Sequence, residues 1–147
     1  MRTLTRAQIV VGVDGSPSSV SALQCAQKLA PALGATIRVV IAWDYPPKFP
    51  GYVPLDTSES AEVAKEHLSN ALYAAFRGDV PDDLQSSVVY AHPVQALIDA
   101  SRDAALLIVG RHGRGSLHHL FLVSVSTACI SEARCPVLVV REAPGSI

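Results

Sequence analysis

Short apolar runs that alternate with segments of helical periodicity constrain the fold of this chain most. The runs are rich in β-branched residues, as is typical of strands buried on both faces, and cover residues 9–13, 36–43, 84–90, 106–109 and 137–140. Between them, small and apolar residues recur at helical spacing in segments that begin at about residues 17, 58, 93 and 121. The alternation predicts an α/β fold with a five-stranded parallel sheet and helices on both faces.

Local signals predict where several of these helices begin and end. Ser16 is a suitable N-cap, and Pro17 stands at the first helical position, where its missing N–H removes no bond. Gly34 ends the first helix and Gly78 the second, while Pro93 begins the third. The run at 84–90 is diluted by polar residues, which favours a place toward the edge of the sheet.

Length and charge bound the class of protein. The 147 residues contain no internal repeat and no linker, so we expect one domain over residues 1–147. A formal net charge of −1 gives no reason to expect a nucleic acid or an anionic membrane surface as a partner, and no apolar run is long enough to span a bilayer. Cys25, Cys129 and Cys135 are odd in number and form no CxxC pair. These features, with no secretory signal expected ahead of the first strand, favour a reduced, cytoplasmic protein.

A glycine-rich stretch at residues 106–126 (LLIVGRHGRGSLHHLFLVSVS) carries the strongest functional signal. An apolar strand leads into a loop with Gly110, Gly113 and Gly115, and a helix follows. Glycines let the main chain approach an anion closely, and a helix N-terminus turns free N–H groups toward it. Ligands of such folds bind beyond the carboxyl ends of the strands, where the winding direction switches. If the first and fourth strands are neighbours, Asp14 and Gly110 flank one crevice.

A proline-rich segment after the second strand fits neither a helix nor a central strand. We expect either a lid over the ligand-binding edge or a surface excursion there. Its prolines and aromatic residues are Tyr45, Pro46, Pro47, Phe49, Pro50, Tyr52 and Pro54.

Three motifs together resemble the universal stress protein family. They are VGVDGS at residues 11–16, Gly110-x-x-Gly113 followed after nine residues by VSVS at 123–126, and CPVLVV at 135–140. The resemblance covers essentially the whole chain. It implies a five-stranded parallel, Rossmann-like sheet of the adenine nucleotide alpha hydrolase-like type, usually in a homodimer. Members of this family fall into two groups. Those with the motif G-x2-G-x9-G-[ST] hold ATP or a related adenine nucleotide, and those without this motif bind none.

The resemblance implies roles for particular residues around the nucleoside. Asp14 and the backbone at Ala42 would lie beside it, and Gly110 would approach the ribose. The ligand would be ATP or another adenine nucleotide, with or without Mg²⁺.

The phosphates would be held by Gly113, Ser124 and Val125. Arg111 and Arg114 either neutralise phosphate charge or are solvated loop residues, and both readings stay open. Val123 stands where the motif has its third glycine. Its isopropyl group adds bulk where the backbone should approach a phosphate, although its N–H can still donate. We therefore expect weakened rather than abolished phosphate binding.

These observations lead to a main functional hypothesis and an alternative. The first is a cytoplasmic, adenine-nucleotide-binding regulatory or stress-response module, and the alternative is a dimeric scaffold that binds no nucleotide because Val123 fills the phosphate site. No Walker motif is present and no lysine lies in the glycine loop, so we do not expect an enzyme, although slow ATP hydrolysis stays open.

Two further expectations concern metals and assembly. His112, His118 and His119 lack a carboxylate or cysteine at ligand spacing, which favours surface histidines over a metal site. The wholly apolar strand at 137–140 would lie at a sheet edge. Pairing it with its own copy in a homodimer would cover that edge.

Overall fold

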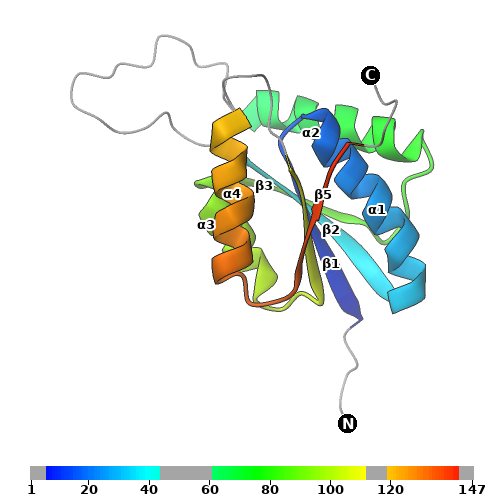
Figure 1. The fold of residues 1–147 in the computed structure, drawn as a ribbon. Helices are drawn as coiled ribbons and strands as arrows, with labels where there is room; N and C mark the ends of the chain where they lie inside the picture. Colours follow the sequence, from blue (N-terminus) through cyan, green and yellow to red (C-terminus); the bar gives the residue numbers. More distant parts are fainter. Residues whose placement is uncertain (1–5, 44–60, 112–118, 143–147) are drawn as a thin grey trace.

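The computed structural model describes residues 6–43, 61–111 and 119–142 (Figure 1). Strands and helices alternate without exception along the described chain, as the apolar runs predict. The elements are β1 (Ala7–Val13), α1 (Pro17–Leu33), β2 (Ala35–Trp43), α2 (Ala61–Phe76), β3 (Gln85–Tyr90), α3 (Pro93–Ser101), β4 (Leu106–Gly110), α4 (His119–Glu132) and β5 (Val137–Val140).

The five strands form one parallel sheet in the order β3-β2-β1-β4-β5. The chain winds outward from β1 in one direction through β2 and β3, and then returns to the other side of β1 for β4 and β5. The switch therefore lies between β1 and β4, so the predicted adjacency of the first and fourth strands is confirmed. The predicted edge positions of β3 and β5 are confirmed as well.

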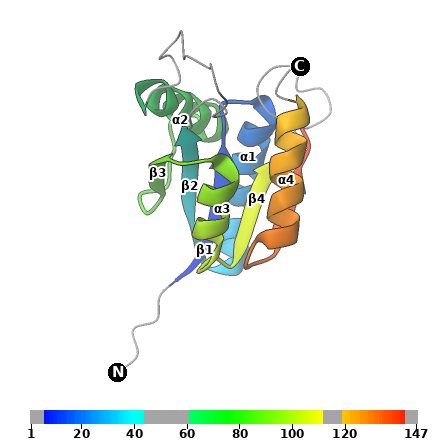
Figure 2. The ribbon, with the colours of Figure 1, turned by 90° about the vertical axis from the view of Figure 1, so that its left-hand side faces the viewer.

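Helices cover both faces of the sheet. Figures 1 and 2 show α1 and α2 on one face and α3 and α4 on the other. The alternation of side chains along a strand supplies both layers at once: Ile9 and Val11 of β1 pack toward α1 and α2, whereas Val10 packs toward α3 and α4. This double burial explains why the strands read as almost unbroken apolar runs.

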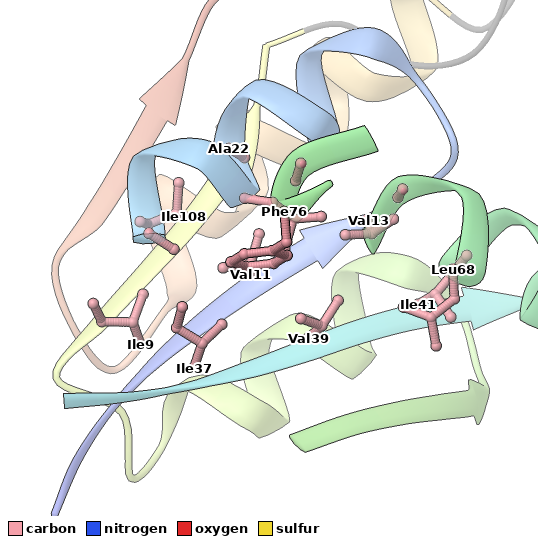
Figure 3. Packing of buried hydrophobic residues seen from close by; sticks show 14 of the residues in the cluster. Ile9, Val11, Val13, Ala22, Ile37, Val39, Ile41, Leu68, Phe76 and Ile108 are labelled. Atoms are coloured by element: carbon pink, nitrogen blue, oxygen red, sulfur yellow. The ribbon is translucent and has the colours of Figure 1, made fainter. Parts of the chain in front are cut away.

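The larger apolar cluster lies under α1 and α2 (Figure 3). Phe76 and Leu68 of α2 belong to this cluster together with side chains from three neighbouring strands, including Val11, Val39 and Ile108. The smaller cluster includes Val125 and Cys129 of α4, of which Cys129 has no exposed surface. Burial, followed by the nearby charges of Glu132 and Cys135, raises the pKa of the Cys129 thiol to about 11. All three cysteines are free thiols.

The caps of α1 agree with the local signals. The Ser16 hydroxyl accepts from the N–H of Ser19, and Pro17 occupies the first turn. Gly34 ends the helix in the left-handed region with φ of +60°, and its N–H donates to the Pro31 carbonyl at 3.2 Å. The last helix differs slightly from expectation, since it begins at His119 rather than at about residue 121. No helix in the described ranges is long and apolar enough to cross a membrane.

Candidate functional site

The sequence-predicted nucleoside residues converge at the carboxyl ends of three adjacent strands. Asp14 directly follows β1, Ala42 is the penultimate residue of β2, and Gly110 ends β4. Because β1 pairs with both β2 and β4, these three positions lie along one edge of the sheet. The fold therefore brings together residues that are far apart in the chain.

The Asp14 carboxylate is held by the turn that follows it. Its Oδ1 atom accepts a hydrogen bond from the Ser16 N–H at 2.9 Å, across Gly15, whose φ is +86°. The side chain is half-buried. Within the described part of the chain Oδ2 has no hydrogen-bond partner, so the carboxylate keeps a free acceptor at the end of β1. Such an acceptor suits a donor such as a sugar hydroxyl or an exocyclic amine.

The N-terminus of α1 is closed by its own side chains. The Ser19 N–H donates to Ser16 Oγ at 3.2 Å, and Ser19 Oγ donates to the Ser16 carbonyl at 2.8 Å. Pro17 supplies no N–H. The bonded Ser19 N–H and the missing N–H of Pro17 leave α1 with fewer free backbone donors for an anion. A phosphate bound at the carboxyl ends of the strands would therefore find more free donors near the end of β4 than at the start of α1.

Gly110 lies against the first turn of α1. A Cβ at this position would stand 2.5 Å from Ser18 Oγ, 2.8 Å from the Ser18 carbonyl carbon and 2.9 Å from its oxygen. Close packing of α1 on β4 therefore requires glycine here, with or without a ligand. The predicted approach of Gly110 to a ribose stays a prediction, because packing alone accounts for the residue.

Arg111 extends the ladder between β4 and β5. Its N–H donates to the Val140 carbonyl at 2.9 Å, and its side chain is exposed. This contact places the residue next to Arg141, which directly follows β5 and is also exposed. Arg141 is not among the residues predicted from the sequence. Only the register of β4 and β5, in which Gly110 stands opposite Val140, reveals that the two arginines are neighbours.

The phosphate-binding part of the prediction lies mostly outside the described residues. Gly113 lies outside the described residues, and the side chains of Val123 and Ser124 are not described either. Because α4 begins at His119, residues 123–125 fall after its first turn, where backbone N–H groups bond within the helix. A phosphate at the N-terminus of α4 would thus meet the amides of its first turn. The Val125 side chain is 5% exposed and belongs to the core.

The end of β2 carries an aromatic pair. Trp43 stands opposite Tyr90 in the β2–β3 register, and their ring centroids are 4.3 Å apart at an interplanar angle of 52°. The proline-rich segment predicted as a lid or a surface excursion, including Tyr45, Phe49 and Tyr52, lies outside the described residues. The histidine loop, with His112 and His118, does too. Among the described residues no group of three side chains is arranged to hold a metal ion.

An open cavity of about 430 Å³ lies beside this edge, between α1 and α2. Gly15 lines one end, and the side chains of Gln24, His67 and Asn70 contribute its polar surface. Asp14, Ala42 and Gly110 do not line it. The cavity is therefore separate from the residues that the sequence motifs single out.

A family model described as the universal stress protein family matches residues 5–141. Universal stress protein Rv2005c of Mycobacterium tuberculosis is 37% identical over 139 residues, which are 92% of this chain and 46% of that protein. Universal stress protein Rv1996 of the same organism is 31% identical over 140 residues, which are 92% of this chain and 44% of the relative. The chain thus spans about half the length of the curated relatives it matches.

Solved structures share the fold. Universal stress protein UspA from Lactobacillus plantarum superimposes with a TM-score of 0.72 at 22% identity, covering 95% of this chain and all of that one. A universal stress protein in complex with cAMP gives a TM-score of 0.68 at 24% identity, with coverage of 95% and 100%. The Archaeoglobus fulgidus protein in complex with dAMP gives 0.65 at 20% identity, covering 94% of this chain and 99% of that one. The fold is the adenine nucleotide alpha hydrolase-like fold.

Proposed function

Because the chain belongs to the universal stress protein family, we propose that it is a regulatory or stress-response module that binds an adenine nucleotide, ATP or AMP, at the carboxyl edge of β1 and β4. The cAMP and dAMP in two structural neighbours support this choice of ligand class. Magnesium would accompany a polyphosphate. A cytoplasmic location is part of the proposal and is supported by the three free thiols.

One observation carries the proposal. β1 and β4 are paired at the switch point of the sheet. Asp14, whose side chain is half-buried, directly follows β1, and Gly110 is the last residue of β4. Ligands of open α/β sheets bind at such a switch point. The Asp14 carboxylate offers a fixed acceptor to the nucleoside, and the positive end of α4 suits the phosphates.

The test begins with the ligand that the protein itself retains. Mass spectrometry of small molecules released from freshly purified, denatured protein should detect an adenine nucleotide. Added ATP or AMP should raise the melting temperature of ligand-free protein. Gly113→Val should abolish this rise, because it fills a position expected to approach a phosphate, and Val123→Gly should strengthen it by restoring the motif.

A dimeric scaffold that binds no nucleotide is the second candidate, favoured by Val123 in place of the third glycine. The two functions give different results in the same experiment. If no nucleotide is released and no adenine nucleotide shifts the melting temperature, even after Val123→Gly, nucleotide binding is refuted. If Val123→Gly alone restores binding, the scaffold is supported.

We also propose that the module is not an enzyme. Its ATP would be a bound effector, and long incubation should leave it intact. Recovery of ADP from protein loaded with ATP, at a rate that depends on Asp14 or Ser124, would contradict this part of the proposal.

Self-association through β5 completes the proposed assembly. β5 lies at the sheet edge, all four of its residues are apolar, and Leu138 is 36% exposed. An apolar edge strand is normally covered, and a symmetric pair of β5 strands would cover it.

A further inference from the structure

Two arginines leave the sheet side by side. β4 and β5 are parallel neighbours with Gly110 in register with Val140, and the next residues are Arg111 and Arg141. The bond from the Arg111 N–H to the Val140 carbonyl, 2.9 Å long, keeps the strands together at this point. Neighbouring strands are about 5 Å apart, so these two side chains, called here the arginine pair, start from adjacent positions.

The arginine pair lacks carboxylate partners among the described residues. Three cations of the described residues have a carboxylate partner: Arg6 pairs with Asp83, Lys65 with Glu62 and Arg102 with Asp99. Neither member of the arginine pair has such a partner there, although Glu142 follows Arg141 directly. The sequence from 111 to 131 contains no aspartate or glutamate at all. Like charges on adjacent strands repel one another, and a bound anion would relieve that repulsion.

Strand alternation, continued one residue past each strand, predicts that both side chains lie on the face that α3 and α4 cover. Val109 and Val139 lie in the apolar cluster on the α3 and α4 face. Residues 111 and 141 come two positions later and continue the same alternation. The first turn of α4 contains no acidic residue, so its macrodipole is not offset there. Three positive features therefore point to one region of the carboxyl edge.

We propose that the arginine pair binds the outer phosphates of a nucleoside di- or triphosphate and so selects a polyphosphate tail over a monophosphate. The proposal rests on the proposed function for the nucleoside end of the ligand. A single guanidinium can pair with one phosphate group through two parallel hydrogen bonds. A second guanidinium adds a partner only when a second phosphate is present. Arg141 is then the residue that sets phosphate number.

The experiment compares four ligands by calorimetry at low salt: adenosine, AMP, ATP with Mg²⁺, and inorganic tripolyphosphate. Arg141→Gln should weaken ATP and tripolyphosphate binding about tenfold, change AMP binding by less than about threefold, and leave adenosine unchanged. Arg141→Lys should recover part of the loss, since it keeps the charge without the planar fork. The salt dependence of ATP binding should also become shallower in Arg141→Gln.

Arg134→Gln is the matched control. Arg134 is an exposed arginine shortly before β5, at the opposite end of that strand from Arg141. The bond from its backbone N–H to Ser101 Oγ, 3.1 Å long, does not depend on the side chain. The substitution therefore removes the same charge while leaving that contact, and it should alter none of the four affinities.

The outcomes separate this proposal from the proposed function. Unchanged ATP affinity in Arg141→Gln, with adenosine and AMP still bound, overturns the role of the arginine pair and leaves the nucleotide module intact. Tripolyphosphate binding that needs Arg141, with no adenosine or AMP binding, supports the arginine pair as an anion site and refutes the nucleotide module. A parallel loss of all four ligands, or binding of none by the unmodified protein, overturns the selection of phosphate number.

Discussion

Gly110 illustrates how a residue in a ligand motif can be required by packing. A Cβ there would meet both the hydroxyl and the backbone of Ser18, and backbone atoms cannot rotate away. We expect Gly110→Ala to lower the free energy of unfolding by about 1–3 kcal/mol, the usual range for overpacking. Urea denaturation followed by circular dichroism measures this change.

Gly12→Ala provides the comparison for Gly110→Ala. A Cβ at Gly12 would lie 3.0 Å from the two terminal methyl carbons of Leu97, which belong to a side chain that can shift slightly. The added methyl also reduces the freedom of the unfolded chain. The loss should therefore stay at about 1 kcal/mol or less. Equal losses for both variants would contradict the packing account of Gly110.

Burial of Cys129 predicts a loss of stability in alkaline solution. The thiol has a pKa of about 11 in the folded protein against an ordinary value of 9.0. Between these values the unfolded chain releases this proton while the folded protein retains it, so stability falls as pH rises. The contribution is fully present below pH 9.0 and is lost up to about pH 11, amounting to about 2–3 kcal/mol.

Urea denaturation at pH 8 and pH 11 tests this prediction in the unmodified protein and in Cys129→Ala. Every other ionisable group is present in both proteins, so its effect on the pH dependence cancels in the comparison. The decrease between the two pH values should be larger when Cys129 is present. Equal decreases would refute the assignment.

At the scale of single residues, the sequence placed Asp14 and Gly110 at the correct strand ends, because strand ends follow from local apolar runs. It did not reveal why Gly110 is glycine or that Arg141 stands beside Arg111. Both facts depend on contacts between segments far apart in the chain. Gly110 meets Ser18 across the interface of α1 and β4, and the two arginines meet through the register of β4 and β5.

At the scale of elements, the serine cap of α1 has a measurable effect. Ser16→Ala removes the side-chain acceptor of the Ser19 N–H and leaves only its bond to the Ser16 carbonyl, so we expect a loss of about 1 kcal/mol in the free energy of unfolding. Ser21→Ala, in the body of the same helix, should change stability by no more than about 0.5 kcal/mol, because alanine is the better helix former there. Chemical denaturation of both variants measures the two changes in the free energy of unfolding. A loss in Ser21→Ala as large as that in Ser16→Ala would argue against a capping effect.

Element boundaries were predictable wherever a cap residue or glycine marks them. Ser16, Gly34 and Pro93 each begin or end a helix within one residue of the predicted position. The start of α4 was predicted two residues late, because the sequence from His118 to Leu122 has no proline or serine cap and its apolar residues also fit the interior of a helix. The β-branched runs located all five strands to within about two residues.

At the scale of the whole molecule, the apolar edge at β5 predicts self-association. Leu138→Lys should place a charge in the proposed interface between two β5 strands and convert a dimer to a monomer in light scattering. Val80→Lys is the matched control, because Val80 is also 36% exposed but lies in the turn after α2. A dimer that survives Leu138→Lys, or one that both variants disrupt, would refute pairing through β5.

The order of strands could be anticipated only in part from the sequence. Alternation of strands and helices implies a parallel sheet, and polar residues in β3 together with the place of β5 at the end of the chain suggested the two edges. The pairing of β1 with β4 could be learned only from the structure, because no local sequence pattern marks the return of the chain to the other side of β1. The candidate site depends on that pairing. From the sequence alone, Asp14 and Gly110 could be placed together only on the assumption that the first and fourth strands are neighbours.

The contact between Trp43 and Tyr90 gives this molecule an intrinsic optical signal at the end of β2. Trp43 is the single tryptophan of the chain, and it directly follows Ala42. Its indole ring lies against the Tyr90 phenol ring, with the centroids 4.3 Å apart. A nucleoside settling beside Ala42 would perturb that emission, so fluorescence titration of the unlabelled protein follows occupancy in real time.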